Sequence, residues 1–543
     1  MAGLAKIFGS GAMTNSIREI EGMEVIFIIG SNTKETHPVI ANRMIKAYRK
    51  GAKIIIADPR KIPMVKFADI YLKMRPGSDI ALINSLANVI ISEGLQNDEF
   101  IREKTEGFEA WKQSIKLHTP EYAEKITGVP REHIIRAARL YGSSRRAGVF
   151  YTMGITQHAC GTDNVMALAN LVSLTGNIGR ESTGINPLRG QNNVQGASDA
   201  ACLPNVYPGY QKVDDPDVRN KFEQAWGTAL SPKVGLTSTE MMNAAAEGKL
   251  KALYIMGENP IITDPNMHHT IKALDSLEFL VVQDIFLTDT AKLAEVVLPA
   301  ACSFEKNGTF TNTERKVQRV RRAVNPPGEA KDDLWIISEV SRRLGYKMET
   351  APEKVFDEYS KLWTALSGMS YARIEKHGLN WPCPTPDHPG TTYLYKDGFP
   401  KGRVPFIPVS YQPPAEVCDD AYPFVLTTGR NLFQYHSGSM TRRVEPIEAH
   451  AGEAYVEINP YDSENLGIMN GDIITVRSRR GEISIKARIT PRVQEGTVFI
   501  PMHYREAAAN VITIDALDPQ VKIPELKVCA VEIITAGASS AHG

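Results

Sequence analysis

The sequence lacks several features that would place a long chain in a familiar class. Its 543 residues carry a formal net charge of zero, which argues against nucleic acid as a partner, because nucleic acid favours a basic face. No apolar run approaches the ~20 residues that cross a bilayer, so we expect no membrane insertion. The opening stretch, MAGLAKIFGSGAMTNSI, lacks the zones of a signal peptide. These absences predict a cytoplasmic protein.

Cysteine is scarce and scattered. There are six cysteines, and no two are closer than 35 residues. No Cys-x-x-Cys pair exists, so the chain does not encode a metal cage built from local thiolate pairs, and we predict no metal ligand in it. Buried, reduced thiols explain most of these cysteines in a cytosolic protein.

The Gly-x-Gly-x-x-Gly fingerprint of a plain NAD site is also absent, but a different pattern occurs twice. EVIFIIGSN and KALYIMGEN each precede a helical stretch and then a second apolar run that ends in aspartate. Gly30 and Asp58 are 28 residues apart, and Gly257 and Asp284 are 27 apart. Ten residues beyond each aspartate come the similar stretches Ala68-Asp69-Ile70 and Ala294-Glu295-Val296.

This internal repeat predicts two parallel sheets with ligand sites at the carboxyl ends of their strands. The glycine lets the backbone approach a ligand, and the acid accepts hydrogen bonds from a ribose diol or a guanine edge. An ordinary strand–helix unit with a turn glycine explains one copy as well. Two copies with matching spacings favour two nucleotide-like ligands.

The remainder of the chain divides by composition. The length allows about three to four domains. The stretch WPCPTPDHPGTTYLYKDGFPKGRVPFIPVSYQPPAE is rich in proline and glycine and indicates an extended surface connector. From about Tyr422, short alternating strands with Gly-Asp and Arg-Gly turns predict a compact β-barrel. The last eight residues are expected to be disordered.

The segment INPLRGQNNVQGASDA, residues 185–200, holds one cation, Arg189, among amides and glycines. A surface arginine that caps a turn is the ordinary explanation. However, LRGQNNVQGA, FTNTERKVQR and NPPGEAK are specific motifs. Through them the chain, from Met1 to about Ile534, resembles the catalytic alpha subunit of molybdopterin-type formate dehydrogenases, most closely those of methanogenic archaea.

The resemblance implies an α/β fold with two Rossmann-like parallel-sheet domains and a C-terminal six-stranded, double-psi β-barrel. The expected boundaries are 1–185 for the first nucleotide-binding domain, 186–345 for the second, whose first part is missing, 346–420 for the connector, 421–535 for the barrel and 536–543 for the tail.

The resemblance also implies the cofactor, a bis-molybdopterin guanine dinucleotide with molybdenum or tungsten. Its two guanine tails explain the repeat. The residues expected to bind the first tail are Gly30, Asn32, Asp58, Arg60, Gly77 and Asp79, with Gly154 and Gln157 added as further cofactor contacts. Those for the second tail are Gly257, Asn259, Asp284 and Thr288, and the barrel positions are Thr428, Arg430, His436, His503, Asn510 and Lys522. Without the resemblance, His436 and His503 are more simply satisfied surface histidines.

In the implied reaction, Arg189 orients formate near the metal, with Gln191 nearby. Formate is a planar anion, and a guanidinium matches it with two parallel charge-assisted hydrogen bonds. The neutral amides around Arg189 are expected to orient it without cancelling its charge. Formate is oxidised to carbon dioxide, and the electrons leave through an iron–sulfur cluster toward a beta subunit that uses a deazaflavin or NAD(P).

Members of the family carry an upstream domain with a [4Fe–4S] cluster and a metal-ligating cysteine or selenocysteine next to a histidine. The sequence opens just past that point, which leaves two explanations: a separate upstream chain, or a UGA selenocysteine codon taken as a stop. We favour the second. Residues 1–543 expressed alone are therefore expected to reduce no dye with formate. They are also expected to give little soluble protein, because an open apolar sheet edge favours aggregation.

Two alternatives remain from the sequence. The chain could be a related enzyme of the same group, such as a formylmethanofuran dehydrogenase or a nitrate reductase, which the arginine of LRGQNN disfavours. It could also be a scaffold subunit that has lost its metal, but both nucleotide motifs and Arg189 are intact. A substrate panel separates the enzymes, and metal analysis identifies a scaffold.

Overall fold

The computed structural model describes residues 1–535, so the tail expected to be disordered lies outside the described residues. The chain forms two compact units. Unit 1 comprises Met1–Gly190, Ile262–Met267 and Tyr393–Gly543, and unit 2 comprises Gln191–Ile261 and His268–Thr392. These divisions differ from the predicted domain boundaries, because unit 1 combines the first nucleotide-binding domain with the barrel.

Unit 1 contains a five-stranded parallel sheet in the order β3-β2-β1-β5-β6. Its strands are β1 (Val25–Ile29), β2 (Lys53–Ala57), β3 (Ile70–Leu72), β5 (Ala147–Tyr151) and β6 (Gly184–Pro187). All five residues of β1 are buried, as expected for a parallel strand covered on both faces.

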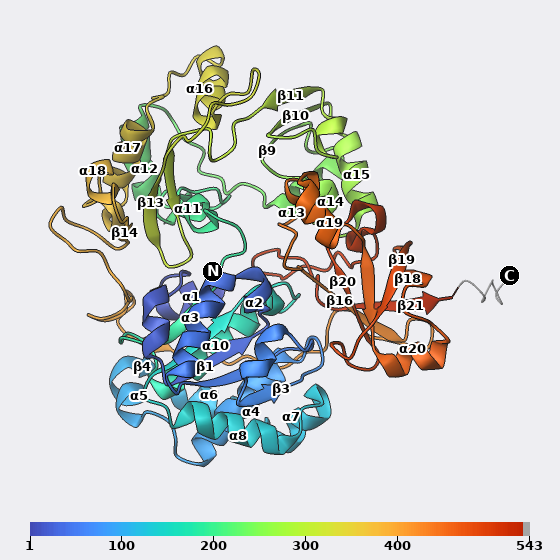
Figure 1. The fold of residues 1–543 in the computed structure, drawn as a ribbon. Coiled ribbons are helices and arrows are strands. Elements are labelled where there is room, and N and C mark those ends of the chain that lie inside the picture. The colour runs from blue at the N-terminus through green and yellow to red at the C-terminus, as the bar shows by residue number, and fades with distance from the viewer. Residues whose placement is uncertain (536–543) are drawn as a thin grey trace. The chain divides into compact units, whose positions relative to one another are not determined.

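Helices cover both faces of this sheet (Figure 1). On one face, Val25, Phe27 and Ile29 join a core with residues of α1 (Ala2–Phe8), α4 (Asp79–Ser92), α8 (Arg131–Gly142) and α10 (Gly161–Thr175). On the other face, Ile26 and Ile28 pack in a core with α3 (Pro38–Arg49). The proline at the first position of α3 suits a helix start, and its apolar residues fall on one face.

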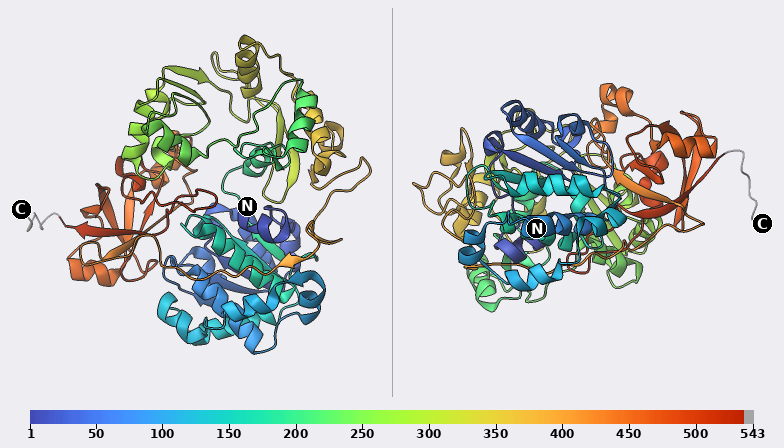
Figure 2. Two further views of the ribbon diagram at one scale, coloured as in Figure 1. Left: turned by 180° about the vertical axis from the view of Figure 1, so that it is seen from behind. Right: turned by 90° about the horizontal axis from the view of Figure 1, so that it is seen from below.

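The C-terminal part of unit 1 is a closed six-stranded barrel, as predicted. Its order is β16-β20-β17-β19-β18-β21, with two parallel pairs, β16–β20 and β17–β19, among antiparallel ones. The strands are β16 (Phe424–Gly429), β17 (Tyr455–Ile458), β18 (Ile473–Ser478), β19 (Gly481–Ile489), β20 (Thr497–Pro501) and β21 (Cys529–Ile534). Figure 2 shows these strands, in orange and red, from two further directions. Alternate burial along β18 and β19 follows from their alternating sequences.

Unit 2 contains the second copy of the repeat as a three-stranded parallel sheet, β11-β10-β9. The strands are β9 (Ala252–Met256), β10 (Phe279–Asp284) and β11 (Val296–Pro299), and α15 (Met267–Asp275) connects β9 to β10. A small antiparallel sheet follows, formed by β12 (Gly308–Thr311), β13 (Lys316–Val320) and β14 (Leu379–Asn380).

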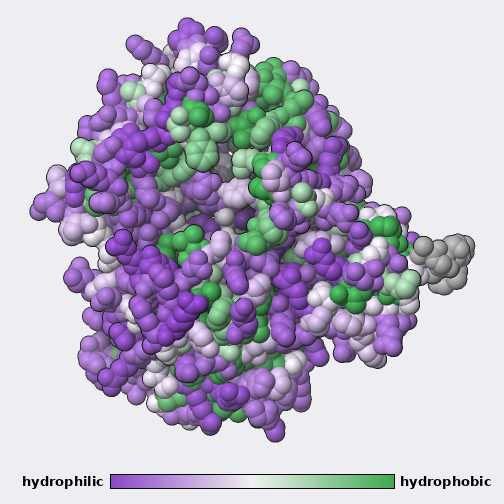
Figure 3. All heavy atoms as spheres, viewed as in Figure 1, coloured by the Kyte–Doolittle hydropathy of each residue, from purple (hydrophilic) through white to green (hydrophobic). Residues whose placement is uncertain are grey.

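The second parallel sheet is less well covered than the first. Tyr254, Met256 and Phe279 are between 42% and 48% exposed, although parallel strands are normally buried on both faces. Figure 3 shows apolar side chains gathered on the surface where β10 and β11 lie in Figure 1. This exposure concerns the faces of the sheet, and the open apolar sheet edge and the solubility of the isolated chain remain predictions.

The segment 346–420 differs from the extended connector that we expected. It contains the helices α17 (Pro352–Leu362) and α18 (Tyr371–Ile374). Trp381, Cys383, Val404 and Phe406 are buried. Both helices precede the proline-rich stretch 381–416, which contains no helix, so the connector role of that stretch stays a prediction.

A buried ion pair joins the first sheet to the barrel within unit 1. The guanidinium of Arg60 donates two hydrogen bonds of 2.6 Å to the carboxylate of Glu457 on β17. Both side chains are buried, and the guanidinium carbon lies 3.9 Å from the ring centre of Phe499 on β20. Removing one partner would leave the other charge uncompensated in the interior.

We therefore expect Glu457→Gln to lower the free energy of unfolding by about 3–5 kcal/mol. Glu93→Gln is the matched control, because Arg139, its partner, is 60% exposed and such surface pairs contribute about 1 kcal/mol or less. Urea denaturation of both variants measures the difference. Equal losses would contradict the importance of the buried pair.

Candidate functional site

The turn after β1 brings two glycines into contact. Gly30 has a φ of 54°, its N–H donates to Ala57 at 3.0 Å, and its carbonyl accepts from the Thr152 hydroxyl at 2.8 Å. A Cβ on Gly30 would lie 2.8 Å from the carbonyl carbon of Gly154, in α9 (Met153–Thr156). Only glycine permits this backbone approach.

Asn32 follows two residues later with an unusual environment. Both polar atoms of its side-chain amide are buried, and neither has a hydrogen-bond partner among the residues that the structure describes. Buried amides are almost always paired. An amide with two donors and one acceptor, held beside a glycine turn, therefore fits a bound polar ligand such as a nucleotide.

Two predicted acids lie buried at the same edge. Asp58 follows β2 and accepts a hydrogen bond from the N–H of Arg60 at 2.9 Å, and burial raises the pKa of Asp58 to about 7. Asp79 begins α4, just after Gly77 with its φ of 76°, and burial raises the pKa of Asp79 to about 6. Hydrogen-bond donors on a ligand would stabilise the charged form of both carboxyl groups.

The loop after α9 is bonded to the chain that enters the last barrel strand. The carbonyl of Gln157 accepts from the N–H of Leu526 at 3.1 Å, and the hydroxyl of Thr428 donates to the carbonyl of Leu526 at 2.8 Å. Lys527 donates to the carbonyl of Thr428 at 2.8 Å. Burial lowers the pKa of Lys527 to about 8. The structure thus brings Gln157 and Thr428 together.

Arg189 follows β6 and is half-buried. Its guanidinium donates to the carbonyl of Gly11 at 3.1 Å, and its own carbonyl lies 2.5 Å from Nε2 of His37. Nδ1 of His37 lies 2.8 Å from the Thr36 hydroxyl, so a neutral ring can donate from Nε2 and accept at Nδ1. Burial lowers the pKa of His37, in keeping with that neutral form.

A second arginine lies beside this turn. A Cβ on Gly190 would be 2.8 Å from the guanidinium of Arg430, so the absence of a side chain leaves room for that group. Burial lowers the pKa of Arg430, although an arginine stays charged in proteins. Arg189 and Arg430 therefore supply positive charge to one neighbourhood of unit 1.

The two barrel histidines are uncharged. His503 accepts from the N–H of Asn431 at 3.1 Å through Nε2 and donates from Nδ1 to the carbonyl of His436. Burial and the nearby Arg430 lower the pKa of His503 and of His436 to about 4. His503 is 1% exposed, so its interpretation as a surface histidine is wrong.

Other predicted residues have partners within the protein. Arg60 is engaged by Glu457, Asn510 donates to the carbonyl of Ile262 at 2.9 Å, and Lys522 donates to the carbonyl of Pro519 at 3.0 Å. Their roles toward a cofactor stay predictions, and each has a structural role besides.

Unit 2 repeats the turn geometry of unit 1. Gly257 has a φ of 64° and donates to Gln283 at 2.9 Å, as Gly30 does to Ala57. Asn259 accepts from the N–H and hydroxyl of Thr290. The Asp284 carboxylate accepts from two backbone N–H groups after β10, and the Thr288 hydroxyl caps Ala291 at 3.2 Å.

The acids beyond each repeat also match. The carboxylate of Asp69 accepts from the N–H of Ile54 at 2.9 Å, and that of Glu295 accepts from the N–H of Leu280 at 2.6 Å. Each therefore ties the entry of a third parallel strand to the second strand. The sequence repeat is a structural repeat.

Two of the amides that follow Arg189 form hydrogen bonds within unit 2. Asn193 accepts from the N–H of Thr311 at 3.0 Å. Gln195 donates to Asp199 at 2.7 Å, and Asp199 accepts from the indole of Trp381 at 2.8 Å. These bonds hold the segment of the two amides in unit 2, and the orientation of Arg189 by neutral amides stays a prediction. Gln191 begins the same unit, and its role stays a prediction.

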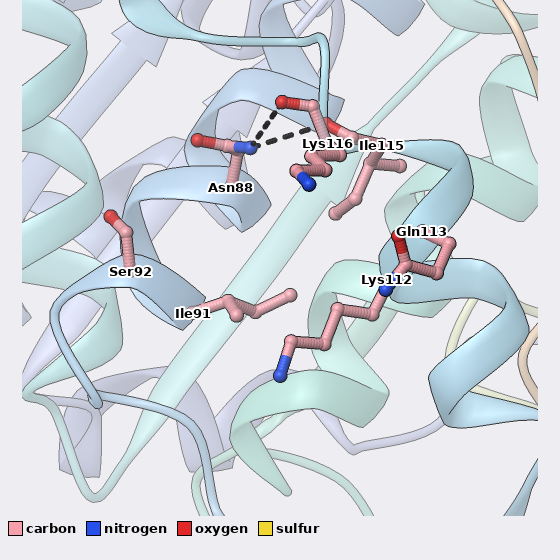
Figure 4. A pocket seen from close by; sticks show the side chains of 7 residues that line it. All are labelled: Asn88, Ile91, Ser92, Lys112, Gln113, Ile115 and Lys116. Atoms are coloured by element: carbon pink, nitrogen blue, oxygen red, sulfur yellow. Dashed lines mark hydrogen bonds between the residues drawn. The ribbon is translucent and has the colours of Figure 1, made fainter.

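Residues 1–535 contain neither a candidate metal-binding cluster nor a helix that could span a membrane. Across residues 1–535, no three His, Cys, Asp or Glu side chains gather to hold a metal ion. No helix in that range is long and apolar enough to cross a membrane. A pocket between α4 and α6 (Phe108–Ser114) lies apart from the predicted residues (Figure 4). Its lining residues are Asn88, Ile91, Ser92, Lys112, Gln113, Ile115 and Lys116.

Comparison with known families assigns this architecture. Residues 5–343 match the molybdopterin oxidoreductase family, and residues 424–530 match the molybdopterin dinucleotide binding domain. A solved structure, acetylene hydratase from Pelobacter acetylenicus, has the same fold, with a TM-score of 0.77 and 21% identity over 98% of this chain and 80% of that chain.

Three relatives are closer in sequence. The chain is 54% identical to the F420-dependent formate dehydrogenase subunit alpha of Methanocaldococcus jannaschii, over 98% of this chain and 80% of that protein. It is 48% identical to subunit alpha of F420-dependent formate dehydrogenase 1 of Methanococcus maripaludis, over 98% and 79%. It is 40% identical to formate dehydrogenase H of Escherichia coli, over 98% and 76%. The chain therefore belongs to the molybdopterin oxidoreductases, among the formate dehydrogenase alpha subunits.

The paired glycines give a test of the site. Alanine at a positive φ costs about 1–2 kcal/mol, which applies to Gly30→Ala and Gly257→Ala alike. A Cβ at Gly257 meets nothing within 4 Å, whereas one at Gly30 meets the backbone of Gly154. We expect Gly30→Ala to lower the free energy of unfolding, measured by urea denaturation, clearly more than Gly257→Ala does. Similar losses of stability in the two variants would contradict the close packing of Gly30 against Gly154.

Proposed function

We propose that the chain binds two molybdopterin guanine dinucleotides around one molybdenum or tungsten and oxidises formate to carbon dioxide. The observation that carries the cofactor part is the unpaired, buried amide of Asn32 beside the Gly30 turn. The duplicated turn in unit 2 supplies the second position. The relatives, which are named as formate dehydrogenases, support formate over formylmethanofuran or nitrate.

The chemistry of the donor set fits the two nucleotide tails. In unit 1, Asn32, Asp58 and Asp79 offer an amide and two buried carboxylates for the donor groups of guanine and ribose. In unit 2, Asp284 has the corresponding place at the end of the second strand. The glycine turns allow the backbone to approach the phosphates. Arg430 and Lys527 supply positive charge in unit 1 for the same anionic groups.

Arg189 is the residue that we propose orients the substrate. Its guanidinium offers two parallel N–H donors to the formate carboxylate. His37 fixes the main chain of this residue through the Arg189 carbonyl, and the carbonyl of Gly11 holds one guanidinium nitrogen. The bound metal centre supplies the acceptor for the two electrons that formate gives up.

The partner is proposed to be a beta subunit that carries the electrons to a deazaflavin or to NAD(P). The names of the two methanogen relatives, both F420-dependent, favour the deazaflavin. The absence of a membrane-spanning helix in residues 1–535 agrees with a cytoplasmic location.

Replacement of Arg189 tests the assignment. In the native enzyme, purified with its cofactor and all its other protein parts, we expect Arg189→Gln to lower kcat/KM for formate by about 10²–10³, because losing a charged, two-point contact costs several kcal/mol. Arg189→Lys keeps the positive charge but loses the two parallel N–H donors, so its kcat/KM for formate should lie between those of Arg189→Gln and wild type. Dye reduction measures turnover, and the guanine nucleotide content should stay unchanged.

Arg139→Gln is the control, since Arg139 is an exposed arginine paired with Glu93, and it should turn over formate normally. Full activity of Arg189→Gln would contradict the role of Arg189.

A further inference from the structure

Unit 1 holds a buried cluster of three ionisable side chains, of which only Asp79 was predicted as a site residue. His158 lies between α9 and α10, Asp79 begins α4, and Glu525 precedes β21. They are 2%, 4% and 1% exposed, respectively. Groups of this kind are rarely buried unless they are paired.

Both ring nitrogens of His158 face acceptors. Nδ1 lies 3.1 Å from the carboxylate of Glu525, and Nε2 lies 3.0 Å from the carbonyl of Gly154 and 3.8 Å from the carboxylate of Asp79. A neutral imidazole has only one N–H donor. Both contacts are hydrogen bonds only if the ring carries two protons and a positive charge.

Glu525 has the environment of an ionised carboxylate. It accepts from the backbone N–H of Ala159 at 2.9 Å and from those of Lys527 and Val528 at 3.2 Å. Several such bonds favour the charged form. Burial alone would raise the pKa of Glu525, but His158 and these bonds hold it below its usual range. Proton donation from Glu525 to Nδ1 is therefore disfavoured.

The charge of His158 agrees with its surroundings. Burial by itself would lower the pKa of His158, but Glu525 and Asp79 outweigh burial and raise it to about 9. Three further titratable groups border these carboxylates: Asp58 beside Asp79, Lys527 beside Glu525, and the thiol of Cys160 beside both.

We infer that His158 is a charged positioning residue of the first guanine nucleotide site. Its two hydrogen bonds join the loop of Gly154 and Gln157 to the barrel segment 525–528, and its charge keeps Asp79 ionised as an acceptor for the guanine or ribose donors. The inference rests on the proposed function, because it assumes a nucleotide at this edge of the sheet.

The pH dependence of stability tests the charge. A histidine whose pKa is raised by folding stabilises the protein fully below its unfolded value of about 6.5, and the stabilisation is lost as the pH rises through about 9. Lys527, whose pKa is lowered, contributes in the opposite direction. The difference in stability between wild type and His158→Gln isolates the histidine.

We expect this difference to be largest at about pH 6.5 and to shrink as the pH rises toward ~10. His118→Gln is the control, because His118 is also buried but burial lowers its pKa, so its variant should show no loss of stabilisation over that window. A difference between wild type and His158→Gln that does not change with pH would overturn the charge of His158.

Nucleotide content tests the positioning role. Guanosine monophosphate released by acid from folded, purified protein should be about two per chain in wild type and in His118→Gln and should fall toward one per chain in His158→Gln. The double variant His158→Gln/Glu525→Gln should recover part of the loss, because two neutral amides can bond to each other.

The outcomes separate the two proposals. Normal nucleotide content in His158→Gln, beside normal content in wild type, would overturn the positioning role alone. No guanine nucleotide in wild type would overturn the proposed function and this inference with it. If His158→Gln is too unstable to purify, the nucleotide content of Glu525→Gln is compared with that of the double variant. A content that is no higher in the double variant than in Glu525→Gln contradicts the pairing of His158 with Glu525.

Discussion

The backbone contact between Gly30 and Gly154 is the constraint on which the first site depends. Because neither residue has a side chain, the turn after β1 and the start of α9 can touch, with Thr152 and His158 bonded to the two glycine carbonyls. That contact brings the side chains after β1, after β2 and at the start of α4 to one edge of the sheet. The amide atoms of Asn32 and the carboxyl groups of Asp58 and Asp79 are all buried.

The duplicated turn shows one local geometry used twice in the chain. Both copies use a glycine at positive φ, a hydrogen bond to the neighbouring strand and an acid that ties the third strand to the second. They differ in their surroundings, because β1 is wholly buried while Tyr254 and Met256 on β9 are exposed. The local chain therefore determines the turn, and the helices around each sheet determine how well its faces are covered.

The sequence predicted what is local and repeated. The apolar strands, the two glycine turns, the acids behind them and the closed barrel all follow from short patterns, and the resemblance supplied the family. The contacts between distant parts of the chain could not be predicted. Ala159 and Glu525 are 366 residues apart, and Arg60 and Glu457 are 397 apart, so no spacing rule connects them. The bonds of the segment after Arg189 show the same limit, since Asn193 accepts from Thr311 and Asp199 accepts from Trp381, both much later in the chain.

The central claim is that this chain holds two guanine dinucleotides and one heavy metal. The most direct measurement quantifies guanosine monophosphate and molybdenum plus tungsten in the same preparation of the protein purified with its native cofactor. The account predicts two nucleotides and one metal atom for each chain. A single nucleotide per chain, or a preparation that turns over formate without molybdenum or tungsten, would contradict it.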